Sequence, residues 1–396
     1  MIGRREFLMT GIAGGALLAG ARAATAEPRA SDPNSRLART PPMGWNSWIP
    51  FRLKVTEKLM REQAEALVKS GMKDAGYEYF VIDGGWEGYH DARGVFQPNH
   101  QKFPDMKGLC DYVHSLGLKV GIHDTPGPMT CSGREGSYGH EEKDAETFAG
   151  WGIDFIKYDW CTAGMVYKPD QMKAAYDKMH RALVRTGRPI LYSLCQYGME
   201  KVWKWGPSVG AQMWRTTGDI SDHYLRMAYI GFEQNGLQKY AGPGHWNDPD
   251  TLTVGNGGMN HEEYKTQMSL WCLLAAPLMA SNDLTKMSPQ ALAILTNREA
   301  IAVNQDRAGR QGYRVHQEGP LEVWMKPLSD GSKAVGLFNR DEHSMKMTVD
   351  FGDLGIHGSA EARDLWAHKN LGTLSRSFSA TVPRHGTVLV KFTSKP

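Results

Sequence analysis

A short apolar segment near the middle of the chain carries ionisable side chains at its end. Residues 154–161 read Asp-Phe-Ile-Lys-Tyr-Asp-Trp-Cys, which is short enough for one buried strand and places Lys157, Asp159 and Cys161 at its close. The C-terminal ends of strands carry the chemistry in parallel α/β sheets and barrels. Charged side chains are costly there unless they are paired or used. A salt bridge that ties a loop to a barrel rim is the structural alternative, and this segment alone leaves it open.

Other strand-like segments also end in polar or aromatic side chains. These residues are Trp45, Asp83, His123, Gln196, Arg215 and Asp250, and Asp219 lies just after the Arg215 segment. Structural ion pairs explain two or three of them. A pocket that binds many hydroxyl groups explains the whole set, because each hydroxyl needs a donor or acceptor in a desolvated site.

Two carboxylates on different strands suit glycoside hydrolysis. One attacks the anomeric carbon or activates water, and the other protonates the leaving oxygen. Lys157 favours the ionised form of Asp159, which suits a nucleophile, and Arg215 stands four residues before Asp219 and can orient it.

Alternating elements must hold these residues in place. Eight strand-like segments alternate with helical patterns, which predicts a (β/α)8 TIM barrel over residues 38–306. The segments lie around residue 45 and at 79–83, 119–123, 154–159, 189–194, 213–215, 244–247 and 277–281.

The pattern changes after residue 306. Short β-rich runs at 321–325, 334–338 and 387–392 are separated by turns, and Val388, Val390 and Phe392 alternate with period two. We therefore expect a C-terminal antiparallel β-sandwich domain over residues 310–396.

The composition and the N-terminus restrict the class of protein. A hydrophobic fraction of 41%, a charged fraction of 22% and a net charge of +3 indicate a globular protein without a nucleic-acid partner. Arg4-Arg5 followed by a weakly apolar run predicts a twin-arginine signal peptide over residues 1–26, with a polar linker at 27–37. We expect export to the periplasm or the extracellular space, and no membrane association after the signal is removed. The oligomeric state stays open.

The five cysteines contain no Cys-x-x-Cys pair, which argues against a zinc or redox site. Cys131 and Cys161 follow predicted strand ends and are the candidates for a disulfide, whereas Cys110, Cys195 and Cys272 are expected to be thiols. The alternative is that all five are small buried side chains. The fourteen histidines include no His-Glu-x-x-His motif, so a metal-dependent hydrolase is not expected.

From Pro41 onward the chain resembles glycoside hydrolase family 27, the α-galactosidase and melibiase family. The motifs that carry the resemblance are Pro-Pro-Met-Gly-Trp-Asn-Ser-Trp (41–48), Lys-Tyr-Asp (157–159), Arg215 with Asp219-Ile220, Gly-Pro-Gly-His-Trp-Asn-Asp-Pro-Asp (242–250), and Ala-Pro-Leu-Met (276–279) with Ser-Asn-Asp-Leu (281–284).

The resemblance implies a retaining enzyme that acts on terminal α-D-galactosides of oligosaccharides or polysaccharides, without a metal or cofactor. Asp159 matches the nucleophile and Asp219 the acid/base, and Cys131 and Cys161 match a disulfide beside the pocket. The remaining expected substrate-binding residues are Trp45, Asp83, His123, Lys157, Gln196, Arg215 and Asp250.

Three of the expected positions depart from the family pattern. Gly84 follows Asp83 where the family usually has a second acid, His123 stands for a tyrosine, and Gln196 stands for a glutamate. These changes leave open a β-L-arabinopyranosidase or an isomaltose-type α-glucosidase activity, and a non-catalytic sugar-binding protein is a third alternative. We expect Gly84→Asp to raise activity on α-galactosides relative to other sugars, unless His123 or Glu87 compensates.

Overall fold

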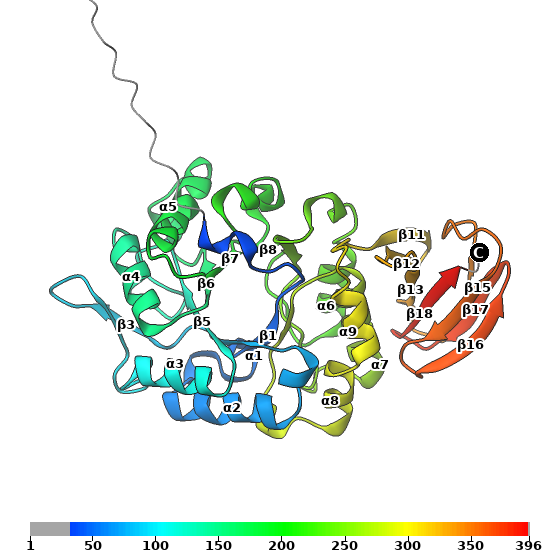
Figure 1. Cartoon of the computed structure of the whole chain (residues 1–396), viewed down its shortest axis with the longest axis horizontal. Coiled ribbons are helices and arrows are strands. Elements are labelled where there is room, and N and C mark those ends of the chain that lie inside the picture. Colours follow the sequence, from blue (N-terminus) through cyan, green and yellow to red (C-terminus); the bar gives the residue numbers. More distant parts are fainter. Residues whose placement is uncertain (1–31, 395–396) are drawn as a thin grey trace, which may run out of the picture. The chain divides into compact units, whose positions relative to one another are not determined.

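A computed structural model describes residues 32–394 of the protein. Eight parallel strands form one sheet in the order β10-β1-β2-β5-β6-β7-β8-β9 and surround a central axis (Figure 1). Their bounds are β1 Met43–Asn46, β2 Tyr79–Ile82, β5 Lys119–Asp124, β6 Phe155–Asp159, β7 Leu191–Cys195, β8 Met213–Arg215, β9 Trp246–Asp248 and β10 Leu278–Ala280. The predicted (β/α)8 barrel is confirmed.

The ring is joined at its last seam by a single bridge. Leu252, just after β9, pairs in parallel with Ala280 of β10. The amide of Leu252 donates to the carbonyl of Met279, and the amide of Ser281 donates back to Leu252. Apolar side chains from the strands, among them Phe155, Met213 and Trp246, fill the interior below the pocket.

Helices connect and cover the strands. They are α1 Trp48–Phe51, α2 Glu57–Lys69, α3 Met106–Ser115, α4 Glu141–Trp151, α5 Met172–Arg185, α6 Tyr224–Phe232, α7 His261–Leu273, α8 Pro289–Leu295 and α9 Arg298–Asn304. Side-chain caps fix some starts: Thr56 accepts from the amide of Leu59 before α2, and Asn260 and Glu263 form a capping box before α7. A short hairpin, β3 Glu87–His90 and β4 Phe96–Pro98, follows β2 outside the barrel sheet.

The C-terminal segment forms antiparallel sheets, as the sequence predicted. One has the order β11-β12-β13-β18-β15-β16, and β14 pairs with β17. The bounds are β11 Tyr313–Glu318, β12 Leu321–Pro327, β13 Lys333–Asn339, β14 Met345–Asp350, β15 Ala360–Asp364, β16 Lys369–Leu374, β17 Ser377–Val382 and β18 Thr387–Ser394. Inward side chains of both sheets, such as Val335, Val349 and Phe378, form their own core.

The β-sandwich packs on α7 of the barrel. Thr266 Oγ1 donates to the carbonyl of His385 at 2.7 Å, and His385 Nδ1 lies 2.7 Å from Glu263 Oε1. Trp366 Nε1 donates to Ser269 Oγ at 2.9 Å. Trp324 and Phe338 belong to the same buried apolar cluster as α7. The two domains therefore share a core at this helix.

The predicted signal peptide, residues 1–26, lies outside the described residues. The described part of the predicted linker, 27–37, is not a free connection, because Pro33–Arg36 forms a 3-10 turn and the buried Asn34 accepts the amide of Ile190 at 2.8 Å. None of the helices within residues 32–394 combines the length and apolarity that a bilayer crossing requires.

Candidate active site

One pocket opens at the C-terminal ends of the barrel strands. Every strand of the barrel contributes to its wall, either from its last residues or from the loop that follows, so the parallel topology alone brings distant segments together. The polar residues that line it are Asn46, Asp83, His123, Lys157, Asp159, Ser193, Tyr197, Arg215, Asp219, Asp248, Asp250 and Thr251.

A lysine between two carboxylates forms the floor on one side. Lys157 Nζ lies 2.8 Å from Asp83 Oδ2 and 3.6 Å from Asp159 Oδ2. Asn46 also donates to Asp83 Oδ2 at 2.8 Å. Burial disfavours the charged form of Asp83, but Lys157 and His123 outweigh it and lower the pKa of Asp83. This side of the pocket offers fixed charges of both signs to a ligand's hydroxyl groups.

Asp159 is held in its ionised form from three directions. Tyr197 donates its hydroxyl to Oδ1 at 2.5 Å, while His123 Nε2 lies 3.7 Å and Lys157 Nζ 3.6 Å from Oδ2. Burial raises the pKa of this carboxyl, but the neighbouring His123 ring, the charge of Lys157 and the hydrogen bond from Tyr197 hold it well below its usual range. An ionised carboxylate that faces a pocket is suited to nucleophilic attack.

Arg215 organises the opposite side. Its Nη2 lies 2.9 Å from Asp250 Oδ2 and 3.2 Å from Asp219 Oδ1. Asp250 is fixed further by the amides of Ile220 and Thr251. Arg215 and Asp250 are largely buried, whereas the side chain of Asp219 is 64% exposed, so Asp219 can exchange protons with water. The two carboxylates that the sequence selected, Asp159 and Asp219, thus lie in one pocket with different surroundings.

Comparison with known proteins identifies the family. The family model described as Alpha galactosidase A matches residues 40–306, and the Alpha galactosidase C-terminal beta sandwich domain matches residues 318–392. The chain is 43% identical over 384 residues to Alpha-galactosidase A of Cellvibrio japonicus, covering 91% of this chain and 93% of that protein. The chain belongs to glycoside hydrolase family 27.

Two solved structures of family 27 show how far the likeness extends. The alpha-galactosidase I of Mortierella vinacea superposes with a TM-score of 0.87 at 35% identity, covering 91% of this chain and 99% of that one. A family 27 β-L-arabinopyranosidase of Geobacillus stearothermophilus gives a TM-score of 0.81 at 28% identity, covering 92% and 99%. Membership of family 27 makes this chain a glycoside hydrolase.

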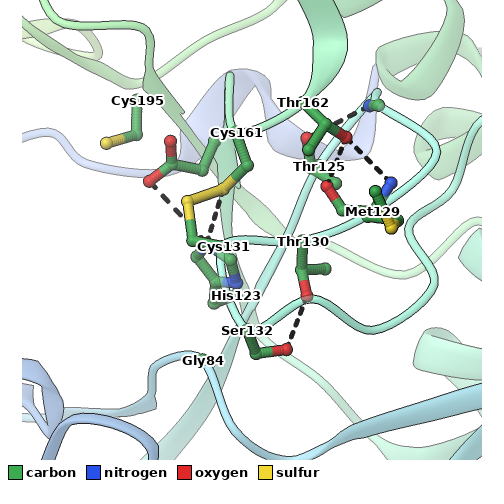
Figure 2. Close-up of a disulfide and its surroundings, with 12 residues drawn as sticks. Gly84, His123, Thr125, Met129, Thr130, Cys131, Ser132, Cys161, Thr162 and Cys195 are labelled. Atoms are coloured by element: carbon green, nitrogen blue, oxygen red, sulfur yellow. Dashed lines mark hydrogen bonds and ion pairs between the residues drawn. A yellow bond between two sulfur atoms is a disulfide. The ribbon is translucent and has the colours of Figure 1, made fainter. Parts of the chain in front are cut away.

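The predicted disulfide of this family 27 chain is present. Cys131 and Cys161 are bonded, with Cα atoms 5.2 Å apart, and Cys131 lines the pocket. Figure 2 shows the His123 ring beneath this bond, and His123 Nε2 lies 3.8 Å from Cys161 Sγ. Cys110, Cys195 and Cys272 are free and buried, as expected.

Two expected sugar contacts lie outside the pocket. Trp45 is fully buried, stacks on Phe80 at 4.8 Å and donates to the carbonyl of Asn282. Side chains alternate between the two faces of β1, so the Trp45 ring points away from the barrel axis. Trp48, three residues later in α1, lines the pocket instead. Gln196 is also fully buried and absent from the wall. The next residue, Tyr197, has φ 64° and carries its hydroxyl to Asp159 in its place.

Sequence reasoning therefore missed Trp48 and Tyr197, and it also missed Asp248. Tyr197 stands directly after Gln196, and Asp248 lies two residues before Asp250 within the motif at 242–250. Burial raises the pKa of Asp248 to about 6, although Arg215 lowers it. Since Asp248 pairs with Arg215 across β8 and β9, its place on the wall follows from register rather than from composition.

Potential metal ligands converge at one place within residues 32–394. His123, Asp159, Cys131 and Cys161 have ligand atoms within 4.8 Å of one another. The two sulfur atoms are bonded to each other, and metal binding requires thiolates. Only one imidazole and one carboxylate are then available, so the donor set does not fit a metal centre.

Proposed function

We propose that this protein is a retaining α-galactosidase with Asp159 as nucleophile and Asp219 as acid/base. The observation that carries the proposal is the pairing of a buried, ionised Asp159 with an exposed Asp219 across one pocket of a family 27 barrel. The proposal has further support from the 43% identity to an enzyme named as an alpha-galactosidase.

In the first step Asp159 attacks the anomeric carbon of a terminal galactoside. The bond to the leaving oxygen breaks, and Asp219 gives that oxygen its proton. The product is a galactosyl ester of Asp159 with inverted configuration and a free alcohol. Asp83 and Lys157 on one side, and Arg215 and Asp250 on the other, supply donors and acceptors for the sugar hydroxyls.

In the second step water replaces the aspartyl oxygen. Asp219, now a carboxylate, accepts a proton from the water as it attacks the anomeric carbon. A second inversion returns the α configuration and frees Asp159. The ester no longer carries the negative charge of Asp159, so Asp219 faces less repulsion as a carboxylate at this stage.

The test is a screen of nitrophenyl glycosides of α-galactose, β-L-arabinopyranose, α-glucose and α-N-acetylgalactosamine. We expect the highest kcat/KM on the α-galactoside, and proton NMR should show α-galactose as the first product. Release of the β anomer would refute the retaining mechanism. Binding without turnover of any of the four would refute the catalytic proposal.

The second candidate sugar is β-L-arabinopyranose. Gly84 leaves space where a second acid is usual, and the fold matches a family 27 β-L-arabinopyranosidase. That likeness is at 28% identity, against 43% for the alpha-galactosidase of Cellvibrio japonicus. The comparison favours the α-galactoside.

We also propose export by the twin-arginine route to the periplasm or beyond. Arg4 and Arg5 support this, and so does the disulfide, because disulfides persist in oxidising compartments. Replacing both arginines by lysine should leave the protein in the cytoplasmic fraction. Unchanged export would contradict the route.

A further inference from the structure

Glu87 is a buried carboxylate behind the pocket wall. It lies at the start of β3, is fully buried and does not line the pocket. Its Oε2 accepts from the amide of Gly85 at 2.6 Å and from Ser132 Oγ at 3.0 Å. Its Oε1 lies 3.0 Å from His123 Nδ1. The amide of Gly85 and the hydroxyl of Ser132 both donate to Oε2, so this side chain is held in one orientation.

His123 connects this hidden carboxylate to the reacting one. Its ring is 1% exposed and presents Nδ1 to Glu87 and Nε2 to Asp159, at 3.0 and 3.7 Å. Figure 2 shows His123 between the Cys131–Cys161 disulfide and the loops that carry Gly84 and Ser132. A ring packed on both sides cannot turn to exchange its nitrogen atoms. Because a carboxylate accepts hydrogen bonds, Nδ1 must carry a proton.

We propose that Glu87 is a positioning residue of the reaction, which acts through His123 and keeps that ring as an imidazolium directed at Asp159. The inference rests on the proposed function, since it assigns Asp159 the role of nucleophile. It adds a residue that touches neither the pocket nor the substrate.

The charges around His123 support this protonation state. The carboxylates facing the ring are Glu87 from the hairpin, Asp83 after β2 and Asp159 on β6; Asp124 is its neighbour on β5, and Lys157 is the nearby cation. Burial disfavours the imidazolium, but the nearby carboxylate of Asp159 and the hydrogen-bonded carboxylate of Glu87 outweigh it and raise the pKa of His123 to about 10. Removing the Glu87 carboxylate weakens that balance without touching the pocket wall.

The experiment compares Glu87→Gln with a matched variant, Glu135→Gln. Glu135 also pairs with a histidine, His90 of the same hairpin, at 2.8 Å, but its side chain is half exposed and is not among the groups that shift the pKa of His123. Nitrogen NMR of the labelled full-length protein reports both ring nitrogens of His123. We expect both to be protonated at pH 7 in the wild type. The midpoint of the His123 titration should fall by about one pH unit or more in Glu87→Gln and should be unchanged in Glu135→Gln.

Kinetics on nitrophenyl α-galactoside supply the second readout. Glu87→Gln should lower kcat by about 100-fold, as loss of a preorganised electrostatic partner does, with little change in KM. Glu87→Asp, which keeps the charge, should recover part of that loss, and Glu135→Gln should match the wild type.

Two results would overturn the positioning role. One is a neutral His123 ring in the wild type at pH 7, which needs no variant to fold. The other is an unchanged kcat and His123 titration in a folded Glu87→Gln. An inactive wild type with a protonated His123 would instead refute the proposed function, so the two failures are distinguishable.

Discussion

The hydroxyl of Tyr197 lies 2.5 Å from Oδ1 of Asp159. Tyr197 adopts φ 64°, a left-handed conformation that side chains rarely take, and such strain persists where the surrounding structure imposes it. The contact leaves Oδ2 of Asp159 to face Lys157 and His123. One neutral donor thus orients the nucleophile, and two cations balance its negative charge.

Replacing the nucleophile should abolish the reaction. We expect Asp159→Asn to lower kcat by about four orders of magnitude or more, since no other group can form the ester. Added azide should not restore a retained product. Asp111→Asn, which removes a surface partner of Lys107 on α3, is the control and should leave turnover unchanged. Persistent activity in Asp159→Asn would reject the assignment.

Replacing the acid/base should affect substrates unequally. Asp219→Asn removes the proton that a poor leaving group needs. General acid catalysis of this kind contributes about 10²–10⁴-fold to the rate. With a dinitrophenyl galactoside the leaving group needs little protonation in the first step. The rate of that step should therefore fall less than the rate with natural substrates. Pre-steady-state measurement of dinitrophenol release reports this step directly. An equal loss for activated and natural substrates would contradict the role of Asp219.

Substitutions of Trp45 and Trp48 should have different effects, one on stability and the other on substrate binding. Trp45→Ala should cost about 3–5 kcal/mol of unfolding free energy, because it empties a fully buried site against Phe80. Trp48→Ala should raise KM while changing stability much less. Urea unfolding and steady-state kinetics on both variants measure this. A reversed pattern would restore Trp45 as the sugar contact.

The structure revises the expectation for Gly84→Asp. An added Cβ has room, at 3.6 Å from Glu87 Oε1, 3.7 Å from the Trp48 ring and 3.8 Å from His123 Nδ1, but a carboxylate there would lie beside that of Glu87 and compete with it for the single His123 imidazolium. Like charges at this spacing disfavour each other, so we expect Gly84→Asp to be about tenfold less active than Gly84→Asn on every sugar tested. If Gly84→Asp instead raised activity on the α-galactoside relative to the other sugars, the expectation from the sequence would stand.

The protonation of His123 should appear in the pH dependence of folding. Its pKa is raised to about 10 in the folded protein, against about 6.5 for an unperturbed histidine. A raised pKa contributes stability that is fully present below about pH 6.5 and is lost as pH rises through about 10. The difference in unfolding free energy between wild type and His123→Gln should therefore shrink from pH 6 to pH 10. A constant difference would contradict this linkage.

The sequence allowed the barrel to be predicted because its strands are short apolar runs with clear ends. All eight predicted segments overlap the observed strands. Edge elements were missed for the opposite reason. Lys369–Leu374 of β16 is almost wholly exposed and carries no apolar run, and the β3–β4 hairpin is too short for a periodic signal.

Within the site, most of the residues expected from strand ends lie on the pocket wall, whereas Trp45 and Gln196 do not. Lys157 and Asp159 stand two residues apart at the end of β6, so their side chains point to the same face of the barrel, and both had been expected at this strand end. Trp45 was expected on the wall and Trp48 was not, because the sequence does not show how the turn after β1 directs the two rings. The left-handed backbone at Tyr197 is likewise not evident from the sequence. The Tyr197 side chain lines the pocket, and that of Gln196 does not.

The single bridge between Leu252 and Ala280 makes the barrel depend on its second domain. The helix that connects the strands at this seam, α7, is the one that the β-sandwich holds through His385 and Trp366. The second domain therefore supports the last joint of the barrel, and a chain cut back to residues 40–306 would lose the contacts that hold α7 at that joint.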